Sequence, residues 1–227
     1  MPQNALFTFA AEPDSGVPRN GSSTVLDPGR IAWVDRLWNG HYPDQAVRGR
    51  ESTRVASTWD KDALHFHFAC TFDELSVDER LGPAGPTSRL WEYDVVELFL
   101  RPRGCSGYFE VEVGPLGQWL DLFVFEPRTR IDWSWRSRLT VDVQLDRSAK
   151  RWDMRLRLPF EAMLTRFPGL KPPEEGEVWR LNLFRISGVH PERRYFAWRP
   201  TFTREPDFHV PAAFGNLMFL SEENLAS

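Results

Sequence analysis

The chain has 227 residues, of which 41% are hydrophobic, and its 28 basic and 32 acidic residues give a net charge of −4. A chain of this size can bury a substantial core as one domain. No basic stripe is present, and no apolar run approaches the roughly 20 residues of a membrane span. We therefore expect neither nucleic acid nor a membrane as a partner.

The first residues lack the basic segment and long apolar stretch that are typical of a secretory signal. A cytoplasmic location is therefore expected, unless a leader has been removed. Cys70 and Cys105 are expected to be free thiols, because a disulfide needs an oxidising compartment. The oligomeric state does not follow from the sequence.

Residues 1–50 contain prolines and glycines at short intervals, such as Pro13, Gly16 and Pro18, which interrupt any long element. We expect this segment to be an irregular N-terminal wrap with about one strand, packed on the domain. Residues 51–227 are expected to form the single folded domain.

From residue 51 onward, apolar and polar residues alternate in short runs, which predicts half-buried strands. The predicted strands are residues 53–59, 63–72, 95–100, 108–113, 118–125, 139–145, 152–158, 178–187, 194–198 and 215–220, and residues 126–137 are a predicted loop. One helical signal covers residues 159–164 and starts at Pro159. Many strands with almost no helix predict an all-β antiparallel sandwich of the jelly-roll or immunoglobulin-like type.

The hairpin at residues 95–113 carries acidic residues in an unusual pattern. If its apolar residues share one face, Glu97 must share the other face with Glu110 and Glu112. Like charges opposite each other on paired strands are destabilising. We therefore expect a compensating arginine, a cation or a ligand with hydroxyl donors, and this face is the candidate site. In the next strand, the residues expected to point into the core are Leu120, Leu122 and Val124.

Several motifs in this order resemble the family 9 carbohydrate-binding modules and their DOMON-like relatives. Trp91 precedes D-V-V-E-L-F-L at residues 94–100, and Y-F-E-V-E-V follows at residues 108–113. The later motifs are R-W-x-x-x-L-x-L-P-F at 151–160, W-R-L-N-L-F-R at 179–185, Y-F-A-W at 195–198 and F-H-V-P-A-A-F-G at 208–215. Each motif is weak alone, but the ordered set over about residues 50–220 is specific.

The resemblance implies a lectin-like β-sandwich that binds a mono- or oligosaccharide without cleaving it, often with a structural calcium ion. In such modules two tryptophans sandwich a sugar ring and a glutamate binds its hydroxyls. Trp91 and Glu97 match the first tryptophan and the glutamate, and Trp198 matches the second tryptophan. The other candidate binding residues are Glu112, on the acidic face, and Asn182 and Arg185, in a family motif. The calcium ligands are not identified.

Three alternatives remain open. A buried ion pair between Glu97 and Arg185 or Arg194 would relieve the repulsion without a ligand. Glu97 and Glu112 could be the paired carboxylates of a glycoside-processing enzyme, although no apolar pocket is evident that would raise the pKa of either. A haem-binding DOMON-like module would need suitably placed His or Met ligands, and no methionine is expected on this face.

Overall fold

The computed structural model describes residues 5–10, 38–39, 51–82, 85–167, 169–191 and 193–220, the first two ranges by their backbone alone. Two strands belong to the N-terminal segment, β1 (Ala5–Ala10) and β2 (Trp38–Asn39), where about one was expected. The rest of the predicted N-terminal wrap lies outside the described residues.

The remaining elements agree closely with the prediction. The strands are β3 (Thr53–Trp59), β4 (Ala63–Thr71), β5 (Val95–Arg101), β6 (Tyr108–Val113), β7 (Trp119–Glu126), β8 (Arg130–Asp132), β9 (Thr140–Asp146), β10 (Arg151–Pro159), β11 (Val178–Ser187), β12 (Arg194–Ala197) and β13 (Gly215–Leu220). The helices are α1 (Phe160–Arg166) and the 3-10 turns η1 (Leu90–Glu92) and η2 (Pro211–Ala213). Strand β8 lies within the predicted loop at residues 126–137, so that part of the prediction is wrong. None of the helices in the described ranges is long and apolar enough to cross a membrane.

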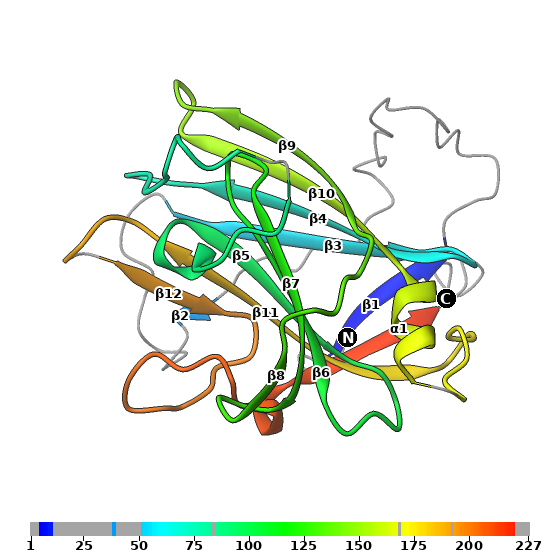
Figure 1. Ribbon diagram of the computed structural model, residues 1–227. Coiled ribbons are helices and arrows are strands. Elements are labelled where there is room, and N and C mark those ends of the chain that lie inside the picture. The colour runs from blue at the N-terminus through cyan, green and yellow to red at the C-terminus, as the bar shows by residue number, and fades with distance from the viewer. Residues whose placement is uncertain are drawn as a thin grey trace.

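The strands hydrogen-bond in the order β8-β7-β6-β5-β11-β13-β1-β3-β4-β10-β9, and β12 and β2 branch from β11. This path folds back on itself, so that β3, β4, β10 and β9 form one layer and β5 to β8 with β11 form a second (Figure 1). The pairing is antiparallel except at β1, which pairs parallel with both β13 and β3. The all-β sandwich is therefore confirmed, with a parallel strand joining its two layers.

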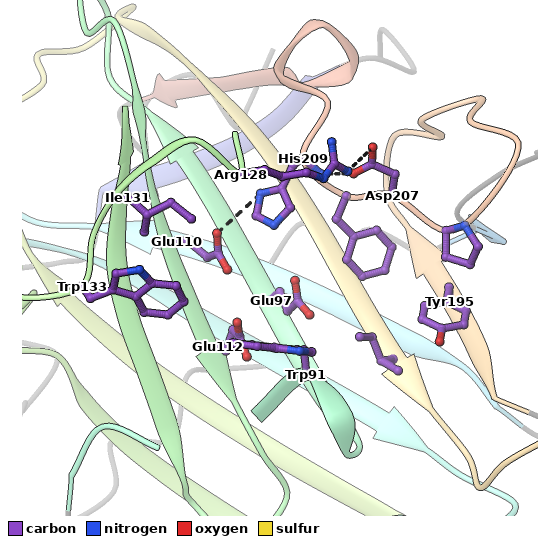
Figure 2. Close-up of a pocket in the computed structure, with 13 residues that line it drawn as sticks. Trp91, Glu97, Glu110, Glu112, Arg128, Ile131, Trp133, Tyr195, Asp207 and His209 are labelled. Atoms are coloured by element: carbon purple, nitrogen blue, oxygen red, sulfur yellow. Dashed lines mark hydrogen bonds and ion pairs between the residues drawn. The ribbon is translucent and has the colours of Figure 1, made fainter. Parts of the chain in front are cut away.

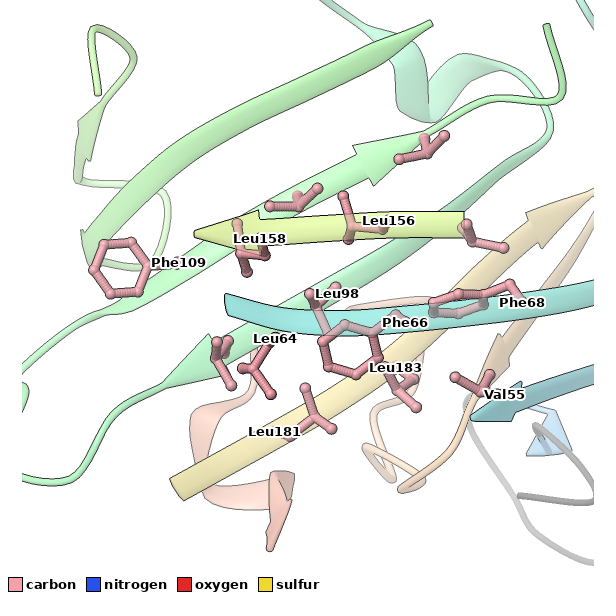
Figure 3. Packing of buried hydrophobic residues seen from close by; sticks show 14 of the residues in the cluster. Val55, Leu64, Phe66, Phe68, Leu98, Phe109, Leu156, Leu158, Leu181 and Leu183 are labelled. Atoms are coloured by element: carbon pink, nitrogen blue, oxygen red, sulfur yellow. The ribbon is translucent and has the colours of Figure 1, made fainter. Parts of the chain in front are cut away.

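Apolar side chains from both layers fill the space between them. Leu64 and Phe66 on β4 lie in one cluster with Leu98 on β5 and Leu183 on β11, and each is at most 2% exposed (Figure 3). Removal of this apolar surface from water is the main driving force for the sandwich. The cluster also places the inward residues of the β5–β6 hairpin as the alternation predicts.

The layer that contains β5 and β6 is buried on its outer face as well. A second cluster there includes Phe99, Tyr108 and Phe184, with Phe208 and Phe214 from the loops packed over them. The expected inward orientation of residues 120, 122 and 124 is wrong, because these residues join the second cluster while Phe123 fills the main core. Alternation alone cannot orient a strand that has apolar residues on both faces.

We predict that Gly107→Ala will destabilise the fold, because the glycine lies where β6 approaches β7 closely. A Cβ at residue 107 would lie 2.2 Å from the carbonyl oxygen of Val124. The free energy of unfolding should fall by about 2 kcal/mol. The control is Gly82→Ala, whose Cβ would have no neighbour within 4 Å. Urea denaturation of both variants checks this, and equal stabilities would contradict the close approach.

Candidate functional site

A cavity of about 350 Å³ opens on the outer face of the β5–β6 hairpin. Glu97, Glu110 and Glu112 lie in the middle of it, and the indoles of Trp91 and Trp133 stand beside them (Figure 2). The rest of the lining consists of Arg128, Ile131, Ile186, Tyr195, Pro206, Asp207, Phe208 and His209. Rigid strands therefore carry the carboxyl groups, while connecting segments supply most of the walls.

The three carboxyl groups are crowded together by the strand register. Glu97 on β5 lies directly opposite Glu112 on β6, and Glu110 follows on the same face. Their exposed fractions are 4%, 1% and 4% for Glu97, Glu112 and Glu110. The acidic face that the alternation predicts is thus confirmed, and it is far more buried than a solvated strand face.

Burial raises the pKa of all three carboxyl groups. The pKa of Glu110 rises to about 7. For Glu97 and Glu112 burial comes first, and the neighbouring carboxylates add repulsion that raises the pKa further. An ionised carboxylate can only accept hydrogen bonds, so crowding the three buried groups favours a proton on at least one of them. Near neutral pH the cluster therefore retains protons. The expectation that no pocket would raise the pKa of Glu97 or Glu112 is wrong.

Acceptor atoms in this cluster are left without partners. The Oε2 atoms of Glu110 and Glu112 are buried and make no hydrogen bond. Among the described residues, the basic atom nearest to Oε2 of Glu110 is Nδ1 of His209, which at 3.8 Å is beyond hydrogen-bond distance. A buried acceptor without a donor costs about 1–3 kcal/mol. A bound ligand with suitable donors would remove that cost.

Arginines do not neutralise the cluster. Among the residues that the structure describes, none forms an ion pair with Glu97 or Glu112. Arg185 lies opposite Val96 and so on the inner face of the sheet, and Arg194 pairs with Glu51 at 2.7 Å. The alternative of an ion pair from Arg185 or Arg194 to Glu97 is therefore wrong, because residue 185 has the wrong parity and residue 194 is engaged elsewhere.

The two indoles of the cavity come from segments outside the alternating strands. Trp91 lies in η1 and is 37% exposed, and Trp133 follows β8 and is 49% exposed. Their ring centroids are 6.3 Å apart and their planes meet at 46°. The rings therefore form a bent wall and not a parallel slot.

Trp133 was missed as a site residue by the sequence, and its position depends on a turn. The Asp132 carboxylate accepts hydrogen bonds from the backbone N–H groups of Ser134 and Trp135 at 3.0 and 3.1 Å. The side chain of Trp135 packs into the main core, while the intervening segment directs Trp133 to the cavity. The sequence contains one indication of this turn. Trp133 stands between Asp132 and Ser134, and an aspartate in such a segment can form an Asx turn.

The opposite rim is fixed by a separate set of polar contacts. Arg128 forms an ion pair with Asp207 at 2.5 Å, and Asp207 accepts a hydrogen bond from the His209 backbone at 3.0 Å. The His209 ring shares a hydrogen bond of 2.6 Å with the Tyr108 hydroxyl. Burial lowers the pKa of His209, which favours the neutral imidazole. These contacts tie the segment before β13 to the β6–β8 strands.

The structure brings three of the predicted site residues together, Trp91, Glu97 and Glu112, and places the other three elsewhere. Asn182 donates from Nδ2 to the Arg199 carbonyl oxygen at 2.9 Å, and its Oδ1 accepts from the Arg199 N–H at 2.9 Å. It therefore holds the segment after β12 against β11.

Arg185 and Trp198 are also buried away from the cavity. Arg185 donates to the Ser52 carbonyl oxygen and to Oγ1 of Thr53, both at 3.0 Å. Trp198 is 6% exposed and belongs to the main core, where its ring fills the space that a Cβ on Gly215 would need. Trp91 and Trp198 therefore do not face each other across an open slot.

The calcium ion implied by the resemblance has no evident side-chain site. Within the described ranges, no group of three or more His, Cys, Asp or Glu side chains is arranged to hold a metal ion. Structural calcium therefore stays a prediction.

We predict losses of stability of very different size on removing two tryptophans. Trp198→Ala should lower the free energy of unfolding by about 3–5 kcal/mol, because it empties part of the core. Trp133→Ala should lower it by less than about 1 kcal/mol, because this indole is half exposed. Chemical denaturation of both variants checks this. A large loss of stability in Trp133→Ala would show that this indole serves packing and not a ligand.

The acidic cluster should make stability depend on pH. The pKa of Glu110 is raised from 4.5 to about 7, so between these values the folded protein binds more protons than the unfolded chain. The contribution of Glu110 to stability is therefore fully present below about pH 4.5 and is lost as the pH rises through about 7. Glu110→Gln should reduce this fall in the free energy of unfolding by on the order of 3 kcal/mol, and Glu174→Gln, at an exposed site, is the matched control. Urea denaturation across this range measures the slope, and a rise of stability with pH would contradict the burial.

A family model and two solved structures are similar to this chain. A model of carbohydrate-binding family 9 matches residues 23–219. The fold is similar to that of a Bacteroides uniformis protein whose proposed role is carbohydrate binding, with a TM-score of 0.74 and 18% identity over 95% of this chain and 99% of that one. It is also similar to a family 9 module from Caldicellulosiruptor kristjanssonii solved with glucose, with a TM-score of 0.62 and 14% identity over 96% of each chain.

Two mammalian relatives also match part of the chain. The human UPF0462 protein C4orf33 is 30% identical over 143 residues, which are 60% of this chain and 64% of that protein. The homologue from Rattus norvegicus is 32% identical over 147 residues, 60% of this chain and 66% of the relative. The matched part is thus somewhat less than two thirds of each relative. From the family match over most of its length, the chain belongs to carbohydrate-binding family 9.

Proposed function

We propose that this protein binds a sugar in the cavity over β5 and β6 without cleaving it. Membership of carbohydrate-binding family 9 supports this proposal, as do the structures of a related fold with glucose and with cellotriose. The observation that carries it is the set of buried carboxyl groups with unpartnered oxygen atoms beside two exposed indoles.

The chemistry of the cavity matches the two kinds of surface on a sugar. A pyranose ring has apolar C–H faces and a rim of hydroxyl groups. Indoles cover such faces, and carboxylates accept hydrogen bonds from the hydroxyls. Hydrogen bonds to a charged acceptor are roughly twice as strong as neutral ones. Glu97 and Glu112 therefore supply orientation, while Trp91 and Trp133 supply contact area.

The geometry of the indoles favours one-sided contact over a sandwich. A ring held between two parallel faces needs about 7–8 Å, because each contact takes about 3.5–4.0 Å. The centroids of Trp91 and Trp133 are 6.3 Å apart and inclined at 46°. The sugar accordingly rests in the angle of the two indoles, and Trp133 takes the role that the family motif gave to Trp198.

A second candidate function follows from the raised pKa values of the paired carboxyl groups. A glycosidase needs one carboxyl group that keeps its proton and a second that is ionised. Burial raises the pKa of both Glu97 and Glu112, which suits the acid but not the ionised partner. Release of a chromophore from an aryl glycoside, lost in Glu97→Gln and in Glu112→Gln, would favour the enzyme.

Calorimetric titration with glucose and cellotriose tests the binding proposal. Trp91→Ala, Trp133→Ala and Glu97→Gln should each weaken binding at least about tenfold, or about 1.4 kcal/mol, since each removes a direct ligand contact. Phe202→Ala is the matched control, because Phe202 is 64% exposed and does not line the cavity. Unchanged binding in all three site variants would remove this cavity as the site, and absence of glucose and cellotriose binding to the wild-type protein would contradict binding of neutral sugars.

A further inference from the structure

The cavity has an excess of acidic groups that its own basic groups do not offset. Arg128, the arginine in the cavity lining, forms an ion pair with Asp207 at 2.5 Å. The imidazole of His209 is partly buried, with its side chain 29% exposed, and it shares a hydrogen bond of 2.6 Å with the Tyr108 hydroxyl. Arg193, outside the lining, donates to the backbone oxygen atoms of Trp91 and Tyr93 at 2.8 and 3.1 Å. Among the described residues, the only basic group within ion-pair distance of the three glutamates is His209, whose Nδ1 lies 3.8 Å from Oε2 of Glu110, so further positive charge must come from a ligand.

The position of the free acceptors is specific. Oε2 of Glu110 and Oε2 of Glu112 have no hydrogen-bond partner, and both residues are at least nine-tenths buried. Figure 2 shows their carboxyl groups and that of Glu97 gathered within the ring of lining side chains. These oxygen atoms are buried hydrogen-bond acceptors inside the cavity, and they do not form a solvated acidic patch.

A ligand ammonium suits this arrangement better than a hydroxyl group does. A hydroxyl brings one donor and no charge, so it cannot replace the protons that keep the crowded carboxyl groups from repelling one another. An ammonium brings three donors and a positive charge, and its hydrogen bonds to carboxylates are charge-assisted. The faces of Trp91 and Trp133 attract a cation as well.

We propose that the preferred ligand is a sugar with a free amino group, whose ammonium lies against Glu97 and Glu112 while its ring rests on Trp91 and Trp133. This inference rests on the proposed sugar binding and adds the ligand class. Binding of such a ligand should also change the number of protons bound to the glutamates. An ammonium favours the ionised carboxylates, so the protons that the glutamates share in the free protein are released on binding. The other titratable groups that face the cluster or line the cavity are Tyr108, Arg128, Arg193, Tyr195, Asp207 and His209.

The test is calorimetric titration at pH 7 with three monosaccharides, namely glucosamine, glucose and N-acetylglucosamine. Glucosamine should bind at least about tenfold more tightly than the other two, since only it carries the charge. Titrations in two buffers with different ionisation enthalpies should show proton release with glucosamine. In Glu112→Gln the preference over glucose should shrink severalfold, and Glu97→Gln serves as a second variant. The exposed Glu174→Gln should keep the preference.

The outcomes separate the two claims. Glucose binding as tightly as glucosamine would overturn the amino-sugar inference and leave sugar binding in place. Tetramethylammonium binding as tightly as glucosamine would overturn it too, since the site would then select a cation without a sugar ring. Binding of none of the monosaccharides would overturn both the inference and the sugar-binding proposal.

Discussion

The cross-strand pairing of Glu97 with Glu112 is the constraint around which the cavity is organised. The inner faces of β5 and β6 fill the main core, so the register cannot slip without moving apolar residues into the wrong layer. The glutamates are consequently held together on the outer face, where burial raises the pKa of each. A fold selected for stability alone would have an apolar or mixed pair here, and this supports the proposal that a ligand binds at the site.

The walls of the cavity follow from how the outer face of this layer is covered. The second apolar cluster supports the loops, and individual polar contacts then set their positions. The Arg128–Asp207 ion pair fixes one rim, the bonds from Arg193 to the backbone around Trp91 fix another, and Asp132 orders the turn that presents Trp133. The carboxyl groups thus sit on rigid strands, while the aromatic contacts come from loops that a family can vary.

Local alternation was sufficient to predict most strands and the shared face of the three glutamates, because those features depend on neighbouring residues. It failed where long-range pairing decides. The parallel joint at β1 depends on β13, some 200 residues away, and the face of Arg185 depends on its pairing opposite Val96. The motif match assigned Trp198 to the site wrongly. Such a match compares the order of residues along the chain and carries no information on which side chains are buried. Trp133 lies in an irregular segment with no periodic signal.

Among the described residues, no arginine or lysine forms an ion pair with the buried carboxyl groups of Glu97, Glu110 and Glu112, and we propose that a ligand compensates their charge. Carbon-13 NMR of the glutamate carboxyl groups, followed through a pH titration with and without glucosamine, measures this most directly. The account predicts that Glu97, Glu110 and Glu112 titrate well above the ordinary range in the free protein and that the ligand lowers their midpoints. Ordinary midpoints in the free protein, or midpoints that saturating glucosamine leaves unchanged, would contradict it.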